Sequence, residues 1–375
     1  MLRLFVSFLL IACVTPLVSA NNQFKTEHYW VRIEPVASGL NHPWSIAFLP
    51  SGDQLVTERS GRLRLIQQGQ LHPEPIAGVP SVAAVGQGGL LDVVLHPDFE
   101  QNGWIYLAYS DQTADGLTTR VMRARLDGHR LVDQMEIFEA LPRSAGGRHF
   151  GGRMVFDPDG YLYIAVGDRG EMARAQDGQD HAGTIIRLHD DGKVPANNPF
   201  VGNDQVWDEI FTLGNRNPQG MTLKPDTGEV WSNEHGPRGG DEINLIRSGL
   251  NYGWPLVTHG INYSGSRITR HTELPGMESP LLDWTPSIAP SGMTFYTGDE
   301  FPAWQGQILN GALRDRLVSR VSVQRTDQGY QLIEEERFLQ GFGERIRDIR
   351  QSPDGEIWIL TDHAQGQVVK LKKME

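Results

Sequence analysis

The stretch RMVFDPDGYLYIAVGD, residues 153–168, decides the fold because it has the pattern of one complete β-hairpin. The Pro-Asp-Gly at residues 158–160 supplies a fixed φ angle, a side chain that hydrogen-bonds the turn, and a residue that tolerates positive φ. The residues after the turn include Tyr161, Tyr163 and Ile164, which are good strand formers. We therefore predict two antiparallel strands joined by a tight turn.

The same pattern of strand, turn and strand recurs along the chain. Further copies begin at Ser45, Asp92, Gly220, Gly292 and Asp348, and the copy at Gly292 departs furthest from the pattern. The mean spacing of about 61 residues exceeds that of a compact four-stranded blade, which leaves room for long loops. Six such units favour an all-β, six-bladed β-propeller. The alternative is a pair of β-sandwiches, which would not need the same turn six times.

The composition is typical of a turn-rich β protein and excludes several classes of function. The 375 residues include 42 Gly, 22 Pro and 9 Trp, and few segments have the pattern of a long helix. The formal net charge of −12 argues against nucleic-acid binding, which needs clustered Lys and Arg. The sequence lacks a strand-borne G-x-G-x-x-G, a G-x-S-x-G and an H-E-x-x-H motif, so a Rossmann nicotinamide site and the common hydrolase motifs are disfavoured.

Residues 1–20 have the pattern of a secretory signal peptide. Arg3 provides a positive start, residues 4–14 are an apolar run too short to span a bilayer, and Val-Ser-Ala at 18–20 is a small-residue cleavage site. The alternative is a lipoprotein signal that ends at Cys13, the single cysteine of the chain. We favour ordinary cleavage, which predicts an exported, periplasmic protein without thiols.

The remaining residues, 21–375, show no linker or change in composition that would separate a second domain. No further stretch is long and apolar enough to predict a transmembrane segment. We therefore predict one propeller domain for 21–375. A monomer and a homodimer are both compatible with the sequence.

His149 and Asp168 stand at opposite ends of the third hairpin and are candidates for acid–base chemistry. A histidine can act as a general base near neutral pH, and a carboxylate beside it would fix its tautomer. Gly151 and Gly152 would allow a ligand or another backbone to approach closely. The alternative is a histidine with a purely structural role, because spacing alone is weak support.

A second group of candidates is cationic. Arg216 and Asn217 precede the fourth copy, Arg345 and Arg347 precede the sixth, and Arg314 follows the fifth. Arginines at the same end of several blades would converge on the mouth of the central channel. Such a group suits a ligand with several carboxylates or phosphates. Separate surface ion pairs are the alternative for each arginine alone.

The segment NEHGPRGGDEINLI, residues 233–246, is a candidate for calcium binding. Backbone carbonyls around Gly236 and Pro237, with Asp241 or Glu242 nearby, are hard oxygen ligands that suit Ca²⁺ better than zinc. The spacing of an EF-hand loop is absent, so the residue chemistry alone gives only modest support.

From about residue 30 to its end, the chain resembles the soluble pyrroloquinoline-quinone (PQQ) dependent sugar dehydrogenases, and within them the bacterial soluble aldose sugar dehydrogenases. Eight motifs carry the resemblance, in the order of the family. They are GQGGLLDVVLHPDF, HFGGRMVFDPDGYLYIAVGD, GNRNPQG, EHGPRGGDEINLI, NYGWP, HGINYSG, APSGMTFYTG and RIRDIRQSPDGEIWILTD.

The resemblance implies a six-bladed propeller that binds PQQ on its axis with calcium and arginines. One departure is Arg314, where many members have lysine; it keeps the charge but changes the geometry. The implied roles are His149 as catalytic base, Asp168 as its orienting carboxylate, Arg216 and Asn217 facing the quinone oxygens, Gln87 and Tyr263 as cofactor contacts, Arg345 and Arg347 as binders of the cofactor carboxylates, Gly236 and Pro237 as carbonyl ligands of the catalytic calcium, and Glu242 and Tyr252 at a further calcium site.

The activity implied by the resemblance is oxidation of an aldose at its anomeric carbon to a lactone. The histidine would take the hydroxyl proton, and PQQ would take a hydride and pass the electrons to an acceptor that the sequence does not identify. Two alternatives are a propeller that binds a sugar or a partner without turnover and a calcium-dependent lactonase. The predicted axial group is rich in arginine and poor in acids, which disfavours the lactonase.

Overall fold

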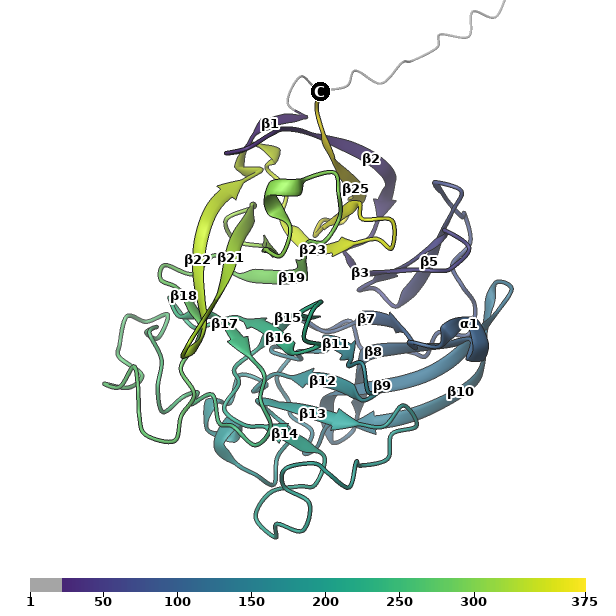
Figure 1. The fold of residues 1–375 in the computed structure, drawn as a ribbon. Helices are drawn as coiled ribbons and strands as arrows, with labels where there is room; N and C mark the ends of the chain where they lie inside the picture. The colour runs from purple at the N-terminus through teal and green to yellow at the C-terminus, as the bar shows by residue number, and fades with distance from the viewer. Residues whose placement is uncertain (1–21) are drawn as a thin grey trace, which may run out of the picture.

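The computed structural model describes residues 22–375, and it is a ring of six antiparallel sheets, or blades, around a central axis (Figure 1). The first strand of each blade is the innermost. Blades one to three contain β3 (Pro43–Phe48), β4 (Gln54–Glu58), β5 (Arg62–Gln67) and β6 (Gln70–Leu71); β7 (Leu90–Leu95), β8 (Trp104–Thr113), β9 (Gly116–Asp127) and β10 (Arg130–Glu139); and β11 (Met154–Phe156), β12 (Leu162–Val166), β13 (Thr184–Leu188) and β14 (Ile210–Thr212).

Blades four to six complete the ring, and helical turns occur only in connections of the described chain. These blades contain β15 (Pro218–Leu223), β16 (Val230–Glu234), β17 (Asp241–Leu245) and β18 (Leu282–Trp284); β19 (Pro290–Phe295), β20 (Ile308–Ala312), β21 (Val318–Thr326) and β22 (Gly329–Phe338); and β23 (Ile346–Gln351), β24 (Ile357–Thr361) and β25 (Gly366–Lys373). The helical turns are α1 (Phe99–Asn102), η1 (Met172–Gln176), η2 (Pro302–Trp304) and η3 (Gln340–Phe342).

The prediction of a six-bladed β-propeller is confirmed. Each predicted hairpin forms the two innermost strands of one blade, including the looser copy at Gly292. The Pro-Asp-Gly turn of the third copy joins β11 to β12, where the backbone N–H of Gly160 donates to the carbonyl of Asp157. Gly160 has a φ of +82°, which explains the glycine.

The ring is closed by strands from the beginning of the described chain. β2 (Trp30–Leu40) pairs antiparallel with β25 and becomes the fourth strand of blade six, and β1 (Gln23–Lys25) adds a fifth. Figure 1 shows these purple strands beside the yellow ones. This closure gives blade six its outer strands, and β2 covers the edge of β25 that would otherwise be unpaired.

Apolar side chains fill the spaces between neighbouring blades, as in the cluster that joins blades five and six. It includes Phe301 and Trp304, whose rings stack at 4.4 Å between centroids, and Ile349 and Ile359 from the inner hairpin of blade six. These side chains are fully buried or nearly so. Such packing makes the blades a rigid scaffold for the residues at their ends.

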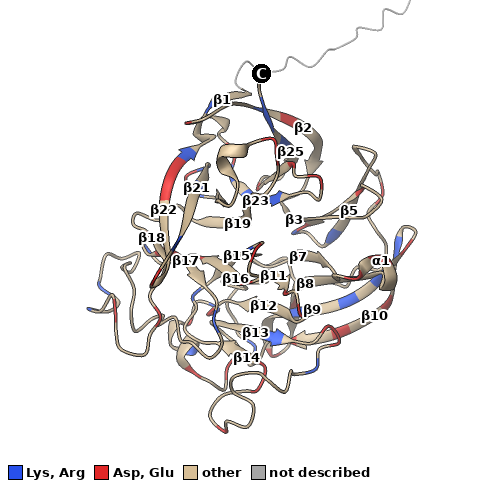
Figure 2. Ribbon diagram, in the orientation of Figure 1, with Lys and Arg blue, Asp and Glu red and all other residues tan. Residues whose placement is uncertain are grey.

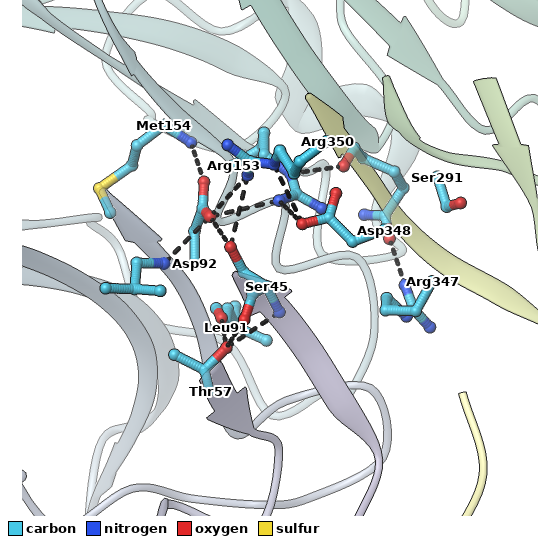
Figure 3. A network of polar contacts seen from close by, with 12 residues as sticks. Ser45, Thr57, Leu91, Asp92, Arg153, Met154, Ser291, Arg347, Asp348 and Arg350 are labelled. Carbon is cyan, nitrogen blue, oxygen red and sulfur yellow. Dashed lines mark hydrogen bonds and ion pairs between the residues drawn. The ribbon is translucent and has the colours of Figure 1, made fainter. Parts of the chain in front are cut away.

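The first residues of the six copies lie at corresponding positions, and the side chains of four of them meet in the centre of the ring (Figure 3). Together with Arg350 they form what we call the axial layer, which consists of Ser45, Asp92, Arg153, Asp348 and Arg350. Asp92 accepts from Ser45 at 2.5 Å, from Arg153 at 3.2 Å and from Arg350 at 3.0 Å. Asp348 accepts from both arginines, at 3.3 and 3.0 Å.

Glycine at the corresponding position of blade five makes room for this layer. A Cβ atom on Gly292 would lie 1.8 Å from a carboxylate oxygen of Asp348. The two aspartates of the layer are fully buried, and their charges are balanced by the two arginines.

A β-bulge precedes the axial layer in most inner strands. The register shifts at this point in five of the six inner hairpins. A bulge lets consecutive residues face the same side of a strand. As a result, the residues just before the axial layer, among them Trp44, Leu91, Gln219 and Arg347, line a cavity directly next to it.

Figure 2 shows basic positions on β9 beside acidic positions on the neighbouring strand β10. Arg120 on β9 contacts Glu136 at 3.1 Å and Glu139 at 2.6 Å on β10. Between residues 22 and 375, no helix has the length and apolarity to cross a membrane. The predicted signal peptide and Cys13 lie outside the described residues.

Candidate functional site

A cavity of about 170 Å³ lies on the axis, with the axial layer beneath it, and every blade or the loop before it contributes to its wall. We call it the axial cavity. Its cationic side chains are Arg59, Arg314, Arg345 and Arg347. The other lining residues are Trp44, Gln87, Leu91, Phe150, Gly151, Asn217, Gln219, His235, Ala289, Leu313 and Asp362.

A wider hollow of about 860 Å³ lies between blades six and one, at the ends that carry the inner hairpin turns. It is lined by Phe48, Trp358 and Lys370 among others and contains none of the candidate site residues. We therefore place the functional site at the axial cavity, where the candidate residues gather, rather than in this wider hollow.

His149 and Asp168 meet as the sequence predicts. Nδ1 of His149 lies 2.6 Å from Oδ1 of Asp168, and the two side chains are 12% and 2% exposed. The backbone N–H of His149 donates to Oε1 of Gln87 at 2.7 Å, which ties the histidine to blade two. The Nδ1–H tautomer is therefore favoured, and within residues 22–375 no hydrogen-bond partner occupies Nε2.

The two glycines near His149, Gly151 and Gly152, allow close packing of neighbouring parts of the chain. Gly151 has a φ of +64°, and a Cβ there would lie 2.5 Å from the carbonyl oxygen of Ala165. Gly152 has a φ of +87° and packs against the side chain of Leu91. The close approach of another backbone, one of the two sequence-based interpretations, is therefore what the structure shows.

The environment of this pair keeps the imidazole neutral at neutral pH. Burial lowers the pKa of His149 below its ordinary value, and Arg216 and Arg148 act in the same direction, while Asp168 opposes them. Burial alone would raise the pKa of Asp168, but the hydrogen bond and charge of His149, with Arg216 and the Gly170 N–H, hold that pKa below its ordinary range. A neutral imidazole beside a carboxylate is the form a general base requires.

Arg216 lies between this pair and the predicted calcium carbonyls. Its guanidinium donates to the carbonyl of His235 at 2.8 Å and to that of Gly236 at 2.7 Å. The backbone N–H groups of Arg216 and Asn217 donate to the Glu234 carboxylate at 2.5 and 3.1 Å. Glu234 thus holds the backbone of Arg216 and Asn217 in place.

Arg345 and Arg347 share one acidic partner, Asp362. Their guanidinium groups contact its Oδ2 at 3.4 and 3.0 Å. Burial would raise the pKa of Asp362, but Arg347, the hydrogen bond from His42 and Arg345 hold it well below its ordinary range. Arg314 stands at the rim of the cavity with a side chain that is 60% exposed and donates to the carbonyl of Ser287.

Two supporting acids, Glu234 and Asp362, escaped the sequence analysis, although the repeat contains their signal. In four copies the second strand ends at or just before an acidic residue, and in the last three of these copies that acid holds a basic or polar group of the site. These residues are Glu58, Asp168, Glu234 and Asp362. Comparing the ends of the six hairpins would have identified them.

Comparison with known proteins agrees with this geometry. A protein-family model described as glucose/sorbosone dehydrogenase matches residues 40–370. The chain belongs to this family. The predicted resemblance to soluble sugar dehydrogenases is therefore confirmed.

Members of the glucose/sorbosone dehydrogenase family include the aldose sugar dehydrogenase YliI of Escherichia coli. It is 44% identical to this chain over 364 residues, which cover 96% of this chain and 97% of the relative. The apo crystal structure of the soluble aldose sugar dehydrogenase of E. coli covers 92% of this chain and 100% of that one, with 44% identity and a TM-score of 0.89. The PQQ-bound structure of the aldose sugar dehydrogenase of Streptomyces coelicolor is 26% identical to this chain. The match covers 91% of this chain and 98% of that one, with a TM-score of 0.76.

Two buried carboxylates face each other next to the axial cavity in this family member. Burial raises the pKa of both Glu234 and Glu242, and their mutual repulsion raises that of Glu242 further. The side-chain amide of Asn244 donates to Glu234 at 3.3 Å and to Glu242 at 3.2 Å. The two glutamates and Tyr252 line a second, smaller cavity. In the described chain, residues 22–375, no three His, Cys, Asp or Glu side chains form a group that could hold a metal ion.

The other predicted calcium residues lie close by. The loop at Gly236 and Pro237 is held by Asp241, which accepts from the N–H of Gly236 at 2.8 Å and from that of Ala289 at 2.7 Å. Asp241 therefore has a supporting role in this structure. The hydroxyl of Tyr252 is already engaged with the backbone of Leu245, which leaves its carbonyl as the group that could face a cation.

Tyr263 is a predicted cofactor contact that the structure does not bring to the axial cavity. It lies in the long connection between β17 and β18, is 74% exposed, and does not line the cavity. Trp254, from the same connection, was not singled out in the sequence, yet its indole N–H reaches Asp168 at 2.8 Å.

Proposed function

We propose that this protein oxidises aldose sugars at the anomeric carbon to lactones, using PQQ and calcium. The observation that carries the proposal is the His149–Asp168 pair beside an axial cavity with arginines along one side. The membership of the glucose/sorbosone dehydrogenase family and the PQQ-bound relative support the choice of substrate and cofactor.

The residues around the axial cavity fit an anionic quinone. PQQ carries several carboxylates, and Arg314, Arg345 and Arg347 supply cations along one side of the cavity. Two buried donors in this region, Nε of Arg216 and Nε of Arg347, have no hydrogen-bond partner among residues 22–375. Buried donors of this kind are costly unless a ligand satisfies them.

The oxygen-rich region next to Arg216 fits calcium. The carbonyls of Gly236 and Pro237 are adjacent, and the paired carboxylates of Glu234 and Glu242 carry repulsion that a divalent cation would relieve. These are hard oxygen ligands, which calcium prefers. We therefore assign Gly236 and Pro237 to the calcium that would touch the cofactor, and Glu242 with the Tyr252 carbonyl to a further calcium.

In this mechanism, bound PQQ would supply the two-electron oxidant and bound calcium would act as a Lewis acid beside it. The chain supplies the proton chemistry. Nε2 of His149 accepts the proton of the anomeric hydroxyl, while Asp168 holds Nδ1–H and stabilises the imidazolium that forms. The carbon that loses its hydrogen with two electrons becomes the lactone carbonyl. The axial layer forms the floor of the cavity.

The test of the proposed function is reconstitution. We expect purified protein with PQQ and Ca²⁺ to bind the quinone and to reduce an artificial dye with several aldoses. The Arg347→Ala variant is expected to bind PQQ about 10- to 100-fold more weakly, because it removes a charge-assisted contact. The control is Arg325→Ala on the exposed end of β21. Failure to bind PQQ at micromolar concentration would contradict the proposal. Lactone hydrolysis without PQQ binding would instead favour the calcium-dependent lactonase.

Calcium is expected to stabilise the protein even without PQQ. A ligand at about 100 times its Kd adds about 2.7 kcal/mol to the free energy of unfolding, which thermal unfolding detects as a rise in Tm. We expect Glu242→Gln to lose most of this rise, because one of the two facing carboxylates is gone. The exposed variant Glu100→Gln serves as control. An equal calcium response in Glu242→Gln would remove Glu242 from the site.

A further inference from the structure

We propose that Trp254 is a positioning residue for the His149–Asp168 pair, acting through its indole N–H on the Asp168 carboxylate. The catalytic consequence rests on the proposed function. The contact and its effect on the histidine do not, because both can be measured in the protein without cofactor.

The carboxylate of Asp168 has a defined donor on each oxygen. Oδ1 accepts from Nδ1 of His149 at 2.6 Å and from the backbone N–H of Gly170 at 2.7 Å. Oδ2 accepts from Nε1 of Trp254 at 2.8 Å. Because Asp168 and Trp254 are 1% and 6% exposed, water does not compete well for these positions. The carboxylate is therefore held against rotation by donors on both sides.

Trp254 is itself fixed by contacts that reach two blades. Its backbone N–H donates to the carbonyl of Gly214 at 2.9 Å, and its carbonyl accepts from Nε2 of Gln176 at 2.7 Å. The guanidinium of Arg216 lies 5.1 Å from the centre of the indole ring, within the range of a cation–π contact. One side chain, 86 residues beyond Asp168, thus contacts both the acid of the pair and the arginine beside it.

Trp254 is uncharged, whereas most other groups around the His149–Asp168 pair are charged. The charged or titratable groups that act on the pair are Arg148, Arg216 and His235 around His149, and Arg216 and Arg169 around Asp168. Removing the indole N–H leaves all of these charges in place. It leaves Oδ2 buried without its donor, so more negative charge concentrates on Oδ1. Asp168 would then bind the protonated histidine more tightly and would orient the neutral one less well.

The variant that isolates this contact is Trp254→Phe, which keeps an aromatic face toward Arg216. We expect the pKa of His149 to rise by about 0.5 to 1 unit in the apoprotein, measured by NMR of the ring nitrogens against pH. In the reconstituted enzyme the acid limb of kcat/KM should move to higher pH by the same amount.

The matched control is Trp304→Phe, which makes the same change at a fully buried tryptophan of blade five. Nε1 of Trp304 has no hydrogen-bond partner among the described residues, so its loss should leave His149 unaffected. An unchanged pKa of His149 in Trp254→Phe would overturn the proposal, as would an equal effect of Trp304→Phe. Absence of turnover in the reconstituted wild type would contradict the proposed function. The NMR titration of the apoprotein would still decide whether Trp254 positions the His149–Asp168 pair.

A measurement on the wild type covers the case in which Trp254→Phe does not fold. The indole N–H resonance of Trp254 is expected to shift as His149 titrates, because the two share the Asp168 carboxylate. The indole resonance of Trp304 should not shift. A Trp254 resonance that ignores the titration of His149 would overturn the proposal without any variant.

Discussion

Replacing His149 with alanine is expected to lower kcat of the reconstituted enzyme by about 10²- to 10⁴-fold, the range that a positioned general base contributes. The reason is that Nε2 of His149 is the atom which accepts the sugar proton, while the arginines that would hold the quinone remain. PQQ affinity should therefore change little. Dye-reduction kinetics at saturating sugar, with PQQ binding measured separately by absorbance, check both expectations.

The control for this variant is His363→Ala, an exposed histidine in the turn before β25. Its kcat should match that of the wild type. The pH profile adds a second criterion: because burial lowers the pKa of His149, the wild type should lose activity only as the pH falls below the ordinary range of histidine. Wild-type turnover in His149→Ala would remove His149 from the role of base.

Replacing Asp92 with alanine is expected to lower the free energy of unfolding by about 3–5 kcal/mol. Asp92 accepts from Ser45, Arg153, Arg350 and the backbone N–H of Met154 in the axial layer (Figure 3). Without it, two arginines share one remaining aspartate in a buried space. Urea unfolding followed by tryptophan fluorescence measures the loss.

Asp127→Ala is the matched control, because Asp127 is an exposed aspartate at the end of β9. Surface substitutions of this kind usually change the stability by less than about 0.5 kcal/mol. A loss in Asp92→Ala no larger than that of the control would mean that the axial layer does not stabilise the ring.

The axial layer also supports the cavity wall, because Arg153 lies 4.2 Å from the ring centre of Trp44. The Asp92→Ala variant should therefore also bind PQQ more weakly.

The inner half of each blade could be predicted from sequence because it is local. A hairpin needs only two strand-forming runs and a turn, and both lie within a few residues of each other. The outer strands are less regular; β6 has two residues, whereas β9 has twelve. The pairing of β2 with β25 joins opposite ends of the described chain, and no local pattern predicts it.

The site was predictable where a residue sits at a repeated position of the hairpin. His149, Asp168, Arg216, Arg345 and Arg347 all lie just before or just after an inner hairpin, and the structure brings them to the axial cavity or its border. Residues in the long connection between β17 and β18 follow no repeat. Tyr263 and Trp254 both come from this connection: one was expected at the cofactor and is exposed, the other was passed over and touches Asp168.

The closure of the ring by β2 and β25 has a consequence for how the protein is made. On the ribosome β2 emerges early but finds its partner only when β25 (Gly366–Lys373), the last strand of the described chain, has been translated. Every residue assigned to the site precedes that strand. A nonsense mutation that removes only β25 would therefore yield a chain with all of its catalytic residues and an open ring, a substrate for proteases rather than an enzyme.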